Sequence, residues 1–427
     1  MTPYCELSKE ELLALKEELT AQYEDAKGKG LKLDMSRGKP SGEQLDMTMP
    51  MMDIFNGHCD MTDEQGVDTR NYGCLEGILG ARRLLGEMLG VDPEHVLVFG
   101  TASLNVMYDS ISRSVTHGVM GSTPWCRLDK VKFLCPAPGY DRHFSITEHF
   151  GIEMITIPMG EEGPDMDMVE EYVKDPAVKG IWCVPMYTNP LGITYSEEVC
   201  RRMANLSPAA EDFRIYWDNA YCVHHLYDDR QDTLPELLSM CRANGKEDMV
   251  LEFASTSKIS FAGAGISCIA ASKANLEWVK KSMTIQIISH DKINQLRHVR
   301  FFKNLDGIKE HMRKHAAIMR PKFELVLDTL ERELGGLGIG SWTKPLGGYF
   351  ISFDSMDGCA KAIVNKCKEA GVTLTGAGAT FPYKNDPRDC NIRIAPSYPT
   401  LDELKQTGEL FVLCVKLVSV EKLLETK

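Results

Sequence analysis

The sequence predicts an α/β protein built around a mostly parallel sheet, and three observations point to that class. The chain has 427 residues, 43% of them hydrophobic and 26% charged, so it can form a large buried core. Short apolar runs recur along it, and most are separated by stretches long enough for a helix, as in parallel strand-helix units. No apolar run approaches the roughly 20 residues that a membrane span needs.

The predicted elements begin with an N-terminal helix. Ser8 and Glu11 have the spacing of a capping box, a leucine-rich stripe follows, and Gly28 and Gly30 end the helix. From there to about residue 95 we expect loops, apart from a helix that begins near Glu76. Seven strands of one sheet are then predicted at residues 96–99, 131–135, 154–157, 181–184, 214–217, 250–254 and 267–271.

The pattern changes after residue 304. A long amphipathic helix follows, which Pro321 is expected to kink, then short strands near Trp342 and at 349–353. A last helix is expected at 401–424, with the N-terminal helix beside it. We therefore expect a large domain at 48–304 that holds the seven-stranded sheet, and a smaller α+β domain made of 1–47 and 305–427.

Composition narrows the class of function. The 14 cysteines lack the paired C-x-x-C spacing of zinc sites, so we expect reduced thiols and no metal. A net charge of −13 and no basic stripe argue against nucleic acid as a partner. The N-terminus carries Glu6, Glu10 and Glu11 where a signal peptide would be basic and then apolar. A cytoplasmic protein without a membrane partner is expected.

Lys258 is the first candidate for chemistry. It follows the predicted strand 250–254 directly, after the hydroxyl residues Ser255, Thr256 and Ser257. Ligands of α/β sheets bind outside the carboxyl ends of the strands, so a reactive lysine and phosphate-binding hydroxyls are expected there. A surface lysine in a polar turn is the alternative.

Two further strand ends carry polar groups. Asp218 comes directly after the strand 214–217 and Tyr221 three residues later, so a carboxylate could hold a pyridine nitrogen protonated while a phenol binds the ring oxygen. A helix cap or turn is the ordinary role of such an aspartate. Asn189 and Pro190 follow the strand 181–184, where the amide can reach two ligands and the peptide bond could be cis, although the turn alone indicates only a loop.

Taken in order, these segments resemble the fold-type I pyridoxal 5'-phosphate (PLP) aminotransferases over essentially the whole chain. The positions that match the family are Tyr72 with Gly77, 100–103, Tyr140, Asn189 with Pro190, Asp218 with Tyr221, 255–258 and Arg393. The segments 36–41, 68–73 and 291–298 resemble a bacterial aspartate aminotransferase branch more closely. The resemblance implies the PLP-dependent transferase fold of type I.

The resemblance implies how PLP would be held. Lys258 would carry it as a Schiff base, with Asp218 and Tyr221 as the other catalytic residues. Thr101 and Ala102 would cradle the phosphate at a helix start. Tyr140 would stack on the ring, unless it is a core tyrosine, and Tyr72 would come from the other subunit of a homodimer. The remaining cofactor residues implied are Ser103, Asn189, Ser255 and Ser257.

The resemblance also implies the substrate residues. Arg393 would grip the α-carboxylate as a two-pronged ion pair, although an arginine on a strand can also face solvent, and Asn189 and Gly38 would line the same site. A cation for a distal carboxylate could come from Arg37, Lys292 or Arg297, each with a surface or interface role as the alternative.

Two positions depart from the family. Ile266 stands where the family commonly has a phosphate-binding arginine. Either N–H groups and hydroxyls hold the phosphate, or Arg297 or Arg300 replaces that arginine. Leu191 stands where threonine is usual, which we interpret as a minor change.

The predicted function is amino-group transfer from an L-amino acid, with aspartate favoured, to 2-oxoglutarate by a ping-pong mechanism. Another fold-type I enzyme, such as an aromatic or alanine aminotransferase or a C–S β-lyase, would keep every cofactor residue named. A PLP-binding regulator without catalysis would need a DNA-binding module of about 60 or more residues ahead of the fold. Only some 30 residues precede Leu31, and they are expected to form a single acidic helix.

Overall fold

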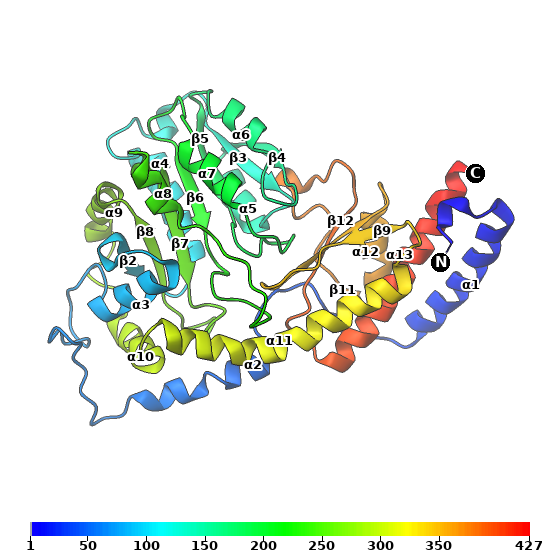
Figure 1. The fold of residues 1–427 in the computed structure, drawn as a ribbon, viewed down its shortest axis with the longest axis horizontal. Helices are drawn as coiled ribbons and strands as arrows, with labels where there is room; N and C mark the ends of the chain where they lie inside the picture. Colours follow the sequence, from blue (N-terminus) through cyan, green and yellow to red (C-terminus); the bar gives the residue numbers. More distant parts are fainter. Residues whose placement is uncertain (1) are drawn as a thin grey trace.

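A seven-stranded sheet forms the centre of the protein, in a computed structural model that describes residues 2–427 (Figure 1). Its spatial order is β2-β8-β7-β6-β5-β3-β4. The pairs β3–β4, β3–β5, β5–β6 and β6–β7 are parallel, while β8 is antiparallel to both of its neighbours. The strands are β2 Val96–Phe99, β3 Lys132–Ala137, β4 Glu153–Pro158, β5 Val178–Cys183, β6 Arg214–Asp218, β7 Val250–Ser255 and β8 Ser267–Ala271.

Helices cover both faces of this sheet because most of its strands, although not the edge strand β4, are buried on both sides. On β3, Phe133 packs into a core with α4, α5 and α9, whereas its neighbour Leu134 packs into one with α6, α7 and α8. A third core joins β2 and β8 to α3 and α10. The helices are α3 Leu79–Leu89, α4 Ser103–His117, α5 Asp141–His149, α6 Met166–Tyr172, α7 Glu197–Asn205, α8 Leu237–Ala243, α9 Lys273–Gln286 and α10 Lys292–Phe302.

A second part of the protein combines small sheets and long helices. Its antiparallel sheet has the order β12-β10-β9, and β1 pairs with β11 in parallel. The strands are β1 Leu33–Asp34, β9 Gly340–Trp342, β10 Ile351–Ser355, β11 Val372–Thr373 and β12 Asn391–Ile394. The helices are α1 Lys9–Gly28, α2 Gly42–Asp46, α11 Leu305–Leu334, α12 Ala360–Glu369 and α13 Leu401–Thr426.

The two ends of the chain meet in this second part. The helix α1 packs against α13, as expected, and Figure 1 shows the two side by side. The predicted capping box of α1 is confirmed: the Glu11 amide donates to Ser8 Oγ at 3.2 Å, and the Ser8 amide donates to the Glu11 carboxylate at 2.7 Å.

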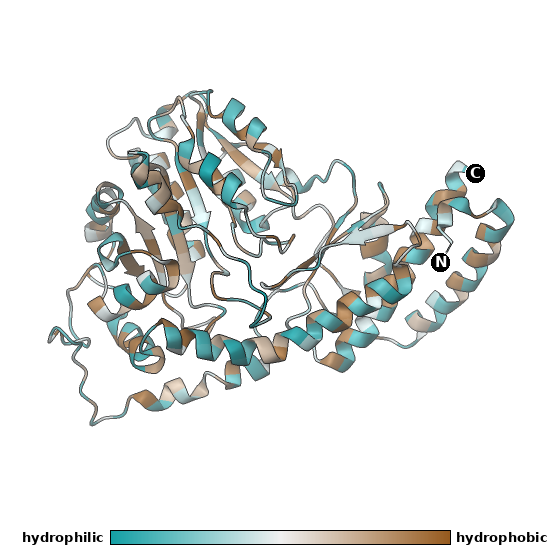
Figure 2. Cartoon of the chain, viewed as in Figure 1, coloured by the Kyte–Doolittle hydropathy of each residue, from teal (hydrophilic) through white to brown (hydrophobic). Residues whose placement is uncertain are grey.

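The helix α11 runs from α10, which packs beside the central sheet, to α13 (Figure 1). Pro321 lies inside it without ending it, and Figure 2 shows hydrophilic and hydrophobic residues in alternation along it. The stretch expected to be loops contains α2 and a 3₁₀ helix at Met49–Ile54, and the helix expected from Glu76 begins at Leu79. The division of the chain after residues 47 and 304 stays a prediction.

Within residues 2–427, no helix has the length and apolar character that crossing a membrane requires.

Candidate active site

Lys258, Asp218 and Tyr221 lie together at one edge of the central sheet. Asp218 ends β6, and Lys258 follows the adjacent parallel strand β7, so the two residues leave the sheet at the same edge. The Lys258 Nζ atom lies 4.9 Å from the centre of the Tyr221 ring. The structure therefore groups the three residues that the sequence predicts as catalytic.

The surroundings tune the amine of Lys258. Removal from water lowers the pKa of this lysine, and the Asp218 carboxylate offsets part of that effect by attracting the charged form. A lowered pKa increases the fraction of neutral amine near pH 7, which is the form that attacks a carbonyl carbon.

The Asp218 carboxylate is held in place from one side only. It is 2% exposed, and its Oδ2 atom lies 3.0 Å from His143 Nε2. The imidazole of His143 is stacked on Trp182 with ring centres 4.4 Å apart. The second oxygen, Oδ1, has no hydrogen-bond partner within residues 2–427. An unpartnered buried carboxylate oxygen is costly unless a ligand pairs with it, and a protonated ring nitrogen fits that need.

Tyr221 can act as a hydrogen-bond donor at the same edge. Burial is the largest cause that raises the pKa of its phenol well above the ordinary value, with smaller contributions from Tyr140 and Asp218. Its hydroxyl therefore keeps its proton at physiological pH and can donate to a ligand oxygen.

The start of α4 and the end of β7 form the predicted phosphate cradle. Ser257 Oγ donates to the Thr101 carbonyl at 3.1 Å, and Ser255 Oγ donates to Ser257 Oγ at the same distance. Ala102 is the N-cap of α4, and its methyl side chain cannot accept hydrogen bonds from the first N–H groups of this 15-residue helix, which begins at Ser103. Uncapped N–H groups at a helix start are suited to an anion.

The position of the missing arginine is filled by core packing. Ile266 is buried, and its amide donates to Thr256 Oγ1 at 3.0 Å. Of the two candidate replacements, Arg297 donates to Asn294 on the same helix, and Arg300 donates to the carbonyl of Thr62 at 3.3 Å. Neither of these hydrogen bonds reaches the cradle residues.

Tyr140 and Asn189 line one small pocket together with His143. Tyr140 immediately precedes α5, with its ring edge-on to His143 at 4.9 Å, and burial raises the pKa of its phenol. The Asn189–Pro190 bond is cis, as the sequence suggested. The Asn189 side-chain oxygen accepts a hydrogen bond from Arg393 Nη1 at 3.2 Å, which connects the cofactor edge to the predicted substrate arginine.

Arg393 is held on several sides. It lies on β12 and is 9% exposed, so it is not the solvent-facing arginine of the alternative interpretation. Its guanidinium lies 4.9 Å above the ring of Phe350, its Nη2 donates to Thr375 Oγ1 at 3.1 Å, and its Nη1 lies 3.0 Å from Asp141 Oδ1. The N-terminal segment also packs against Phe350, because Gly38 lies so close to the ring that a Cβ atom on residue 38 would overlap it.

The remaining predicted cations have different surroundings. Arg37 is exposed next to Gly38. Lys292 is buried and donates to the Asn71 carbonyl at 2.7 Å, which ties down the loop that carries Tyr72. Tyr72 is 79% exposed, so its hydroxyl is free to reach a neighbouring molecule.

Sequence reasoning missed His143. The only signal is a histidine three residues after Tyr140, at a spacing that places it on the first turn of a helix, and such a residue is ordinarily part of the core. Its role becomes visible only through its contact with Asp218, which lies 75 positions away.

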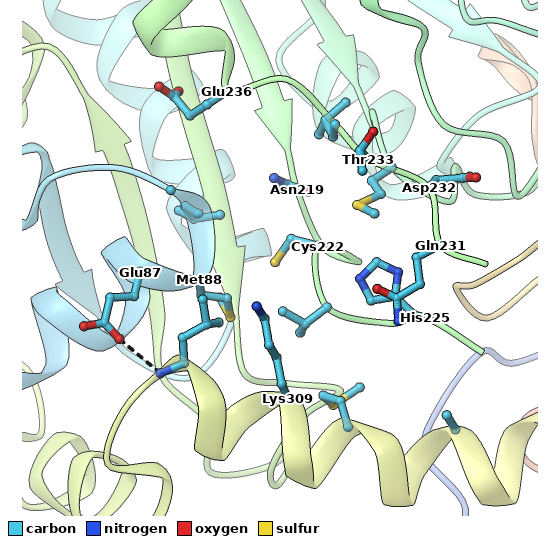
Figure 3. Close-up of a pocket in the computed structure, with 18 of the residues that line it drawn as sticks. Glu87, Met88, Asn219, Cys222, His225, Gln231, Asp232, Thr233, Glu236 and Lys309 are labelled. Carbon is cyan, nitrogen blue, oxygen red and sulfur yellow. Dashed lines mark hydrogen bonds between the residues drawn. The ribbon is translucent and has the colours of Figure 1, made fainter. Parts of the chain in front are cut away.

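A separate cavity of about 620 Å³ lies between the segment after β6, the end of α3 and α11 (Figure 3). Asn219, Cys222 and Lys309 line it, and Figure 3 shows Lys309 extending from α11 into it. The Asn219 amide donates to the buried Glu252 at 3.0 Å. Among the described residues, no group of three or more His, Cys, Asp or Glu side chains could hold a metal.

Fold and site together define the class: an α/β enzyme of fold type I, with a lysine and a carboxylate at the same edge of the sheet. The family described as aspartate amino-transferase matches residues 7–427. The aspartate aminotransferase of Corynebacterium glutamicum is 45% identical over 406 residues, which are 95% of this chain and 94% of that protein.

Solved structures agree with this assignment. An aspartate transaminase structure from Corynebacterium glutamicum has a TM-score of 0.96, 43% identity and 99% coverage of both chains. At 21% identity, the α-aminoadipate aminotransferase of Thermus thermophilus, complexed with N-(5'-phosphopyridoxyl)-L-leucine, shares the fold with a TM-score of 0.73 over 93% of this chain and 94% of that one. The chain belongs to the aspartate amino-transferase family and is a fold-type I aminotransferase.

Proposed function

We propose that the protein is a PLP-dependent aminotransferase with aspartate as the amino donor and 2-oxoglutarate as the acceptor. One observation supports the cofactor above all others: the amine of Lys258 shares a sheet edge with the unpartnered carboxylate oxygen of Asp218. The names of the relatives support aspartate as the amino donor, since a protein and a solved structure from Corynebacterium glutamicum, at 45% and 43% identity, are both named as aspartate aminotransferases or transaminases.

The cofactor would be held at three places. Lys258 would bind its aldehyde carbon, Asp218 would pair with the ring nitrogen, and Tyr221 would donate to the ring oxygen. The N–H groups at Ala102 and Ser103, together with the hydroxyls nearby, would bind the phosphate without an arginine. When bound, PLP supplies an electron sink for the substrate Cα and carries the amino group between the two half-reactions.

The residues then divide the chemical work. Once free, the Lys258 amine would act as a base that takes the proton from the substrate Cα and then as an acid that delivers it to the former aldehyde carbon of the cofactor. Asp218 would keep the ring nitrogen of the cofactor protonated, and His143 orients Asp218 through the Asp218 Oδ2 atom. The tyrosine hydroxyl stays protonated because it is buried, so it acts as a donor and does not compete for the Cα proton.

The substrate carboxylate would bind Arg393. A guanidinium recognises a carboxylate through two parallel N–H groups, which fixes the orientation of the Cα–H bond as well as the affinity. Asn189 lies 3.2 Å from the same guanidinium and would contact both the substrate and the cofactor. Arg37 is exposed and is the candidate to bind a distal carboxylate of the substrate, whereas the amine of Lys292 already donates to the Asn71 carbonyl.

We also propose an active homodimer, in which the exposed Tyr72 reaches the cofactor phosphate of the other subunit. The 14 cysteines are all free thiols, which agrees with a reducing compartment such as the cytoplasm.

The substrate proposal is tested with purified protein, PLP, 2-oxoglutarate and a panel of amino acids, with glutamate formation as the readout. Aspartate should give a kcat/KM at least tenfold above alanine and aromatic amino acids. Equal values would contradict the proposed specificity, and pyruvate released from cysteine conjugates without glutamate would instead indicate a C–S β-lyase.

The Lys258→Ala variant tests the cofactor proposal. It should lose the visible absorbance of the holoenzyme and all transamination, while Lys309→Ala, which removes a lysine from the separate cavity, should keep both. An unchanged visible spectrum in Lys258→Ala would refute the role of this lysine.

A further inference from the structure

Asp141 occupies an unexpected position beside the predicted substrate arginine. Its Oδ1 atom lies 3.0 Å from Arg393 Nη1, and its side chain is 31% exposed where Arg393 is almost fully buried. The Asp141 carboxylate is therefore the more solvent-accessible partner of a nearly buried guanidinium, and a substrate carboxylate that binds Arg393 would meet this ion pair.

The hydrogen bonds of Arg393 leave little room for a second carboxylate. Its Nη1 nitrogen carries two N–H groups, and these face two acceptors, Asp141 Oδ1 and Asn189 Oδ1. Its Nε atom is fully buried and out of reach. A two-pronged grip therefore needs both terminal nitrogens, and Nη1 can take part only if it releases one of its present acceptors.

Of the two acceptors, Asp141 is the one that can leave. Asn189 is 3% exposed and follows the buried strand β5, whereas the Asp141 carboxylate reaches solvent. Arg393 also does not depend on Asp141 for its position, because the Phe350 ring, Thr375 Oγ1 and Asn189 hold the guanidinium from other sides.

Asp141 lies at the start of a helix. It is the first residue of the nine-residue helix α5, where the partial positive charge of the helix start attracts a carboxylate. The Ser145 hydroxyl donates to the Asp141 carbonyl at 2.9 Å, so the backbone at this point is anchored while the side chain can rotate.

We propose that Asp141 is a built-in competitor for the substrate: its carboxylate takes the place of the substrate α-carboxylate on Arg393 and must swing away before an amino acid or oxo acid can bind. The inference rests on the proposed role of Arg393 as the carboxylate site. With a competing internal contact, the apparent affinity for every carboxylate ligand is the intrinsic affinity multiplied by the fraction of molecules in which the contact is broken. Asp141 is thus a residue that sets KM rather than kcat.

The size of the effect follows from the exposure of the pair. In a partly exposed ion pair, the formed state is only a few times more populated than the broken state. We therefore expect removal of the Asp141 charge to tighten ligand binding about three- to tenfold. Amino donor and oxo-acid acceptor should gain equally, because both present the same carboxylate to Arg393.

The test uses the holoenzyme and the variants Asp141→Asn and Asp141→Ala. Isothermal titration calorimetry with succinate, a dicarboxylate that has neither an amino nor an oxo group, should give a Kd about three- to tenfold lower than wild type. Steady-state kinetics should give KM values for aspartate and 2-oxoglutarate that fall by the same factor, with kcat within twofold. Glu148→Gln removes one exposed charge from the same helix and should change neither quantity.

Three results would overturn the proposal. A higher Kd for succinate in both variants would mean that Asp141 positions Arg393, and an unchanged Kd would mean that the contact does not compete. An equal gain in affinity from Asp141→Asn in an Arg393→Ala background would show a general charge effect. Succinate binding does not depend on turnover, so loss of transamination in the wild type would count against the proposed function and leave this test intact.

Discussion

Replacement of Asp218 by asparagine tests how the site keeps the cofactor ring cationic. The carboxylate is 2% exposed and its Oδ1 atom has no hydrogen-bond partner among residues 2–427, so its charge acts in a poorly screened environment. Two opposite unit charges about 4 Å apart interact with about 4 kcal/mol at an effective dielectric constant of 20. Loss of that attraction corresponds to a fall in kcat of roughly 10³-fold.

The assay compares kcat for aspartate and 2-oxoglutarate at saturating PLP, with cofactor content measured from visible absorbance. The variant His143→Gln keeps the Asp218 charge but weakens its orientation through Oδ2, and we expect a smaller loss of about tenfold. If Asp218→Asn keeps kcat within threefold of wild type while fully loaded with cofactor, the carboxylate does not act on the ring.

Three further predictions follow from buried groups. Burial raises the pKa of Glu252 from 4.5 to about 8, so the folded state is favoured below pH 4.5 and loses this stabilisation as the pH rises toward 8. Between pH 5 and 9, the free energy of unfolding measured with denaturant should therefore fall less for Glu252→Gln than for wild type. Equal falls would contradict the raised pKa of Glu252. Because the pKa of Lys258 is lowered, the rate of PLP binding to the apoenzyme, followed by absorbance, should stop rising with pH before the pH reaches the ordinary lysine pKa of about 10.4. A rate that still rises above that pH would contradict the lowered pKa. Arg393→Lys replaces a two-pronged donor by a point charge and should raise KM for both substrates about 30- to 100-fold in steady-state kinetics, and an unchanged KM would exclude the predicted grip.

The central sheet was predictable because most of its strands are short runs of buried residues. All seven predicted strands are present, with β5 beginning three residues early, at Val178. Lys179 hid that start because a charge usually lies outside a buried strand, whereas here its amine pairs with Asp212 at 2.6 Å. The stretch before residue 95 was harder, since α2 is five residues long and the next helix is a 3₁₀ turn.

The candidate site was predictable where its residues follow strands. Lys258, Asp218 and Asn189 each stand at or shortly after the end of a strand of one sheet, and parallel strands bring such ends to one edge. Contacts between distant segments could not be predicted in this way. The pairing of Asp141 with Arg393 joins residues 252 positions apart, and only the docking of β12 against the start of α5 creates it.

The most direct measurement is to locate the bound cofactor. The holoenzyme is reduced with borohydride, digested and analysed by mass spectrometry for a pyridoxyl-modified lysine. We expect the label on Lys258 alone, in the peptide that contains Ser255 and Ser257. A label on Lys292 or Lys309 with Lys258 unmodified would contradict the assignment of the active site.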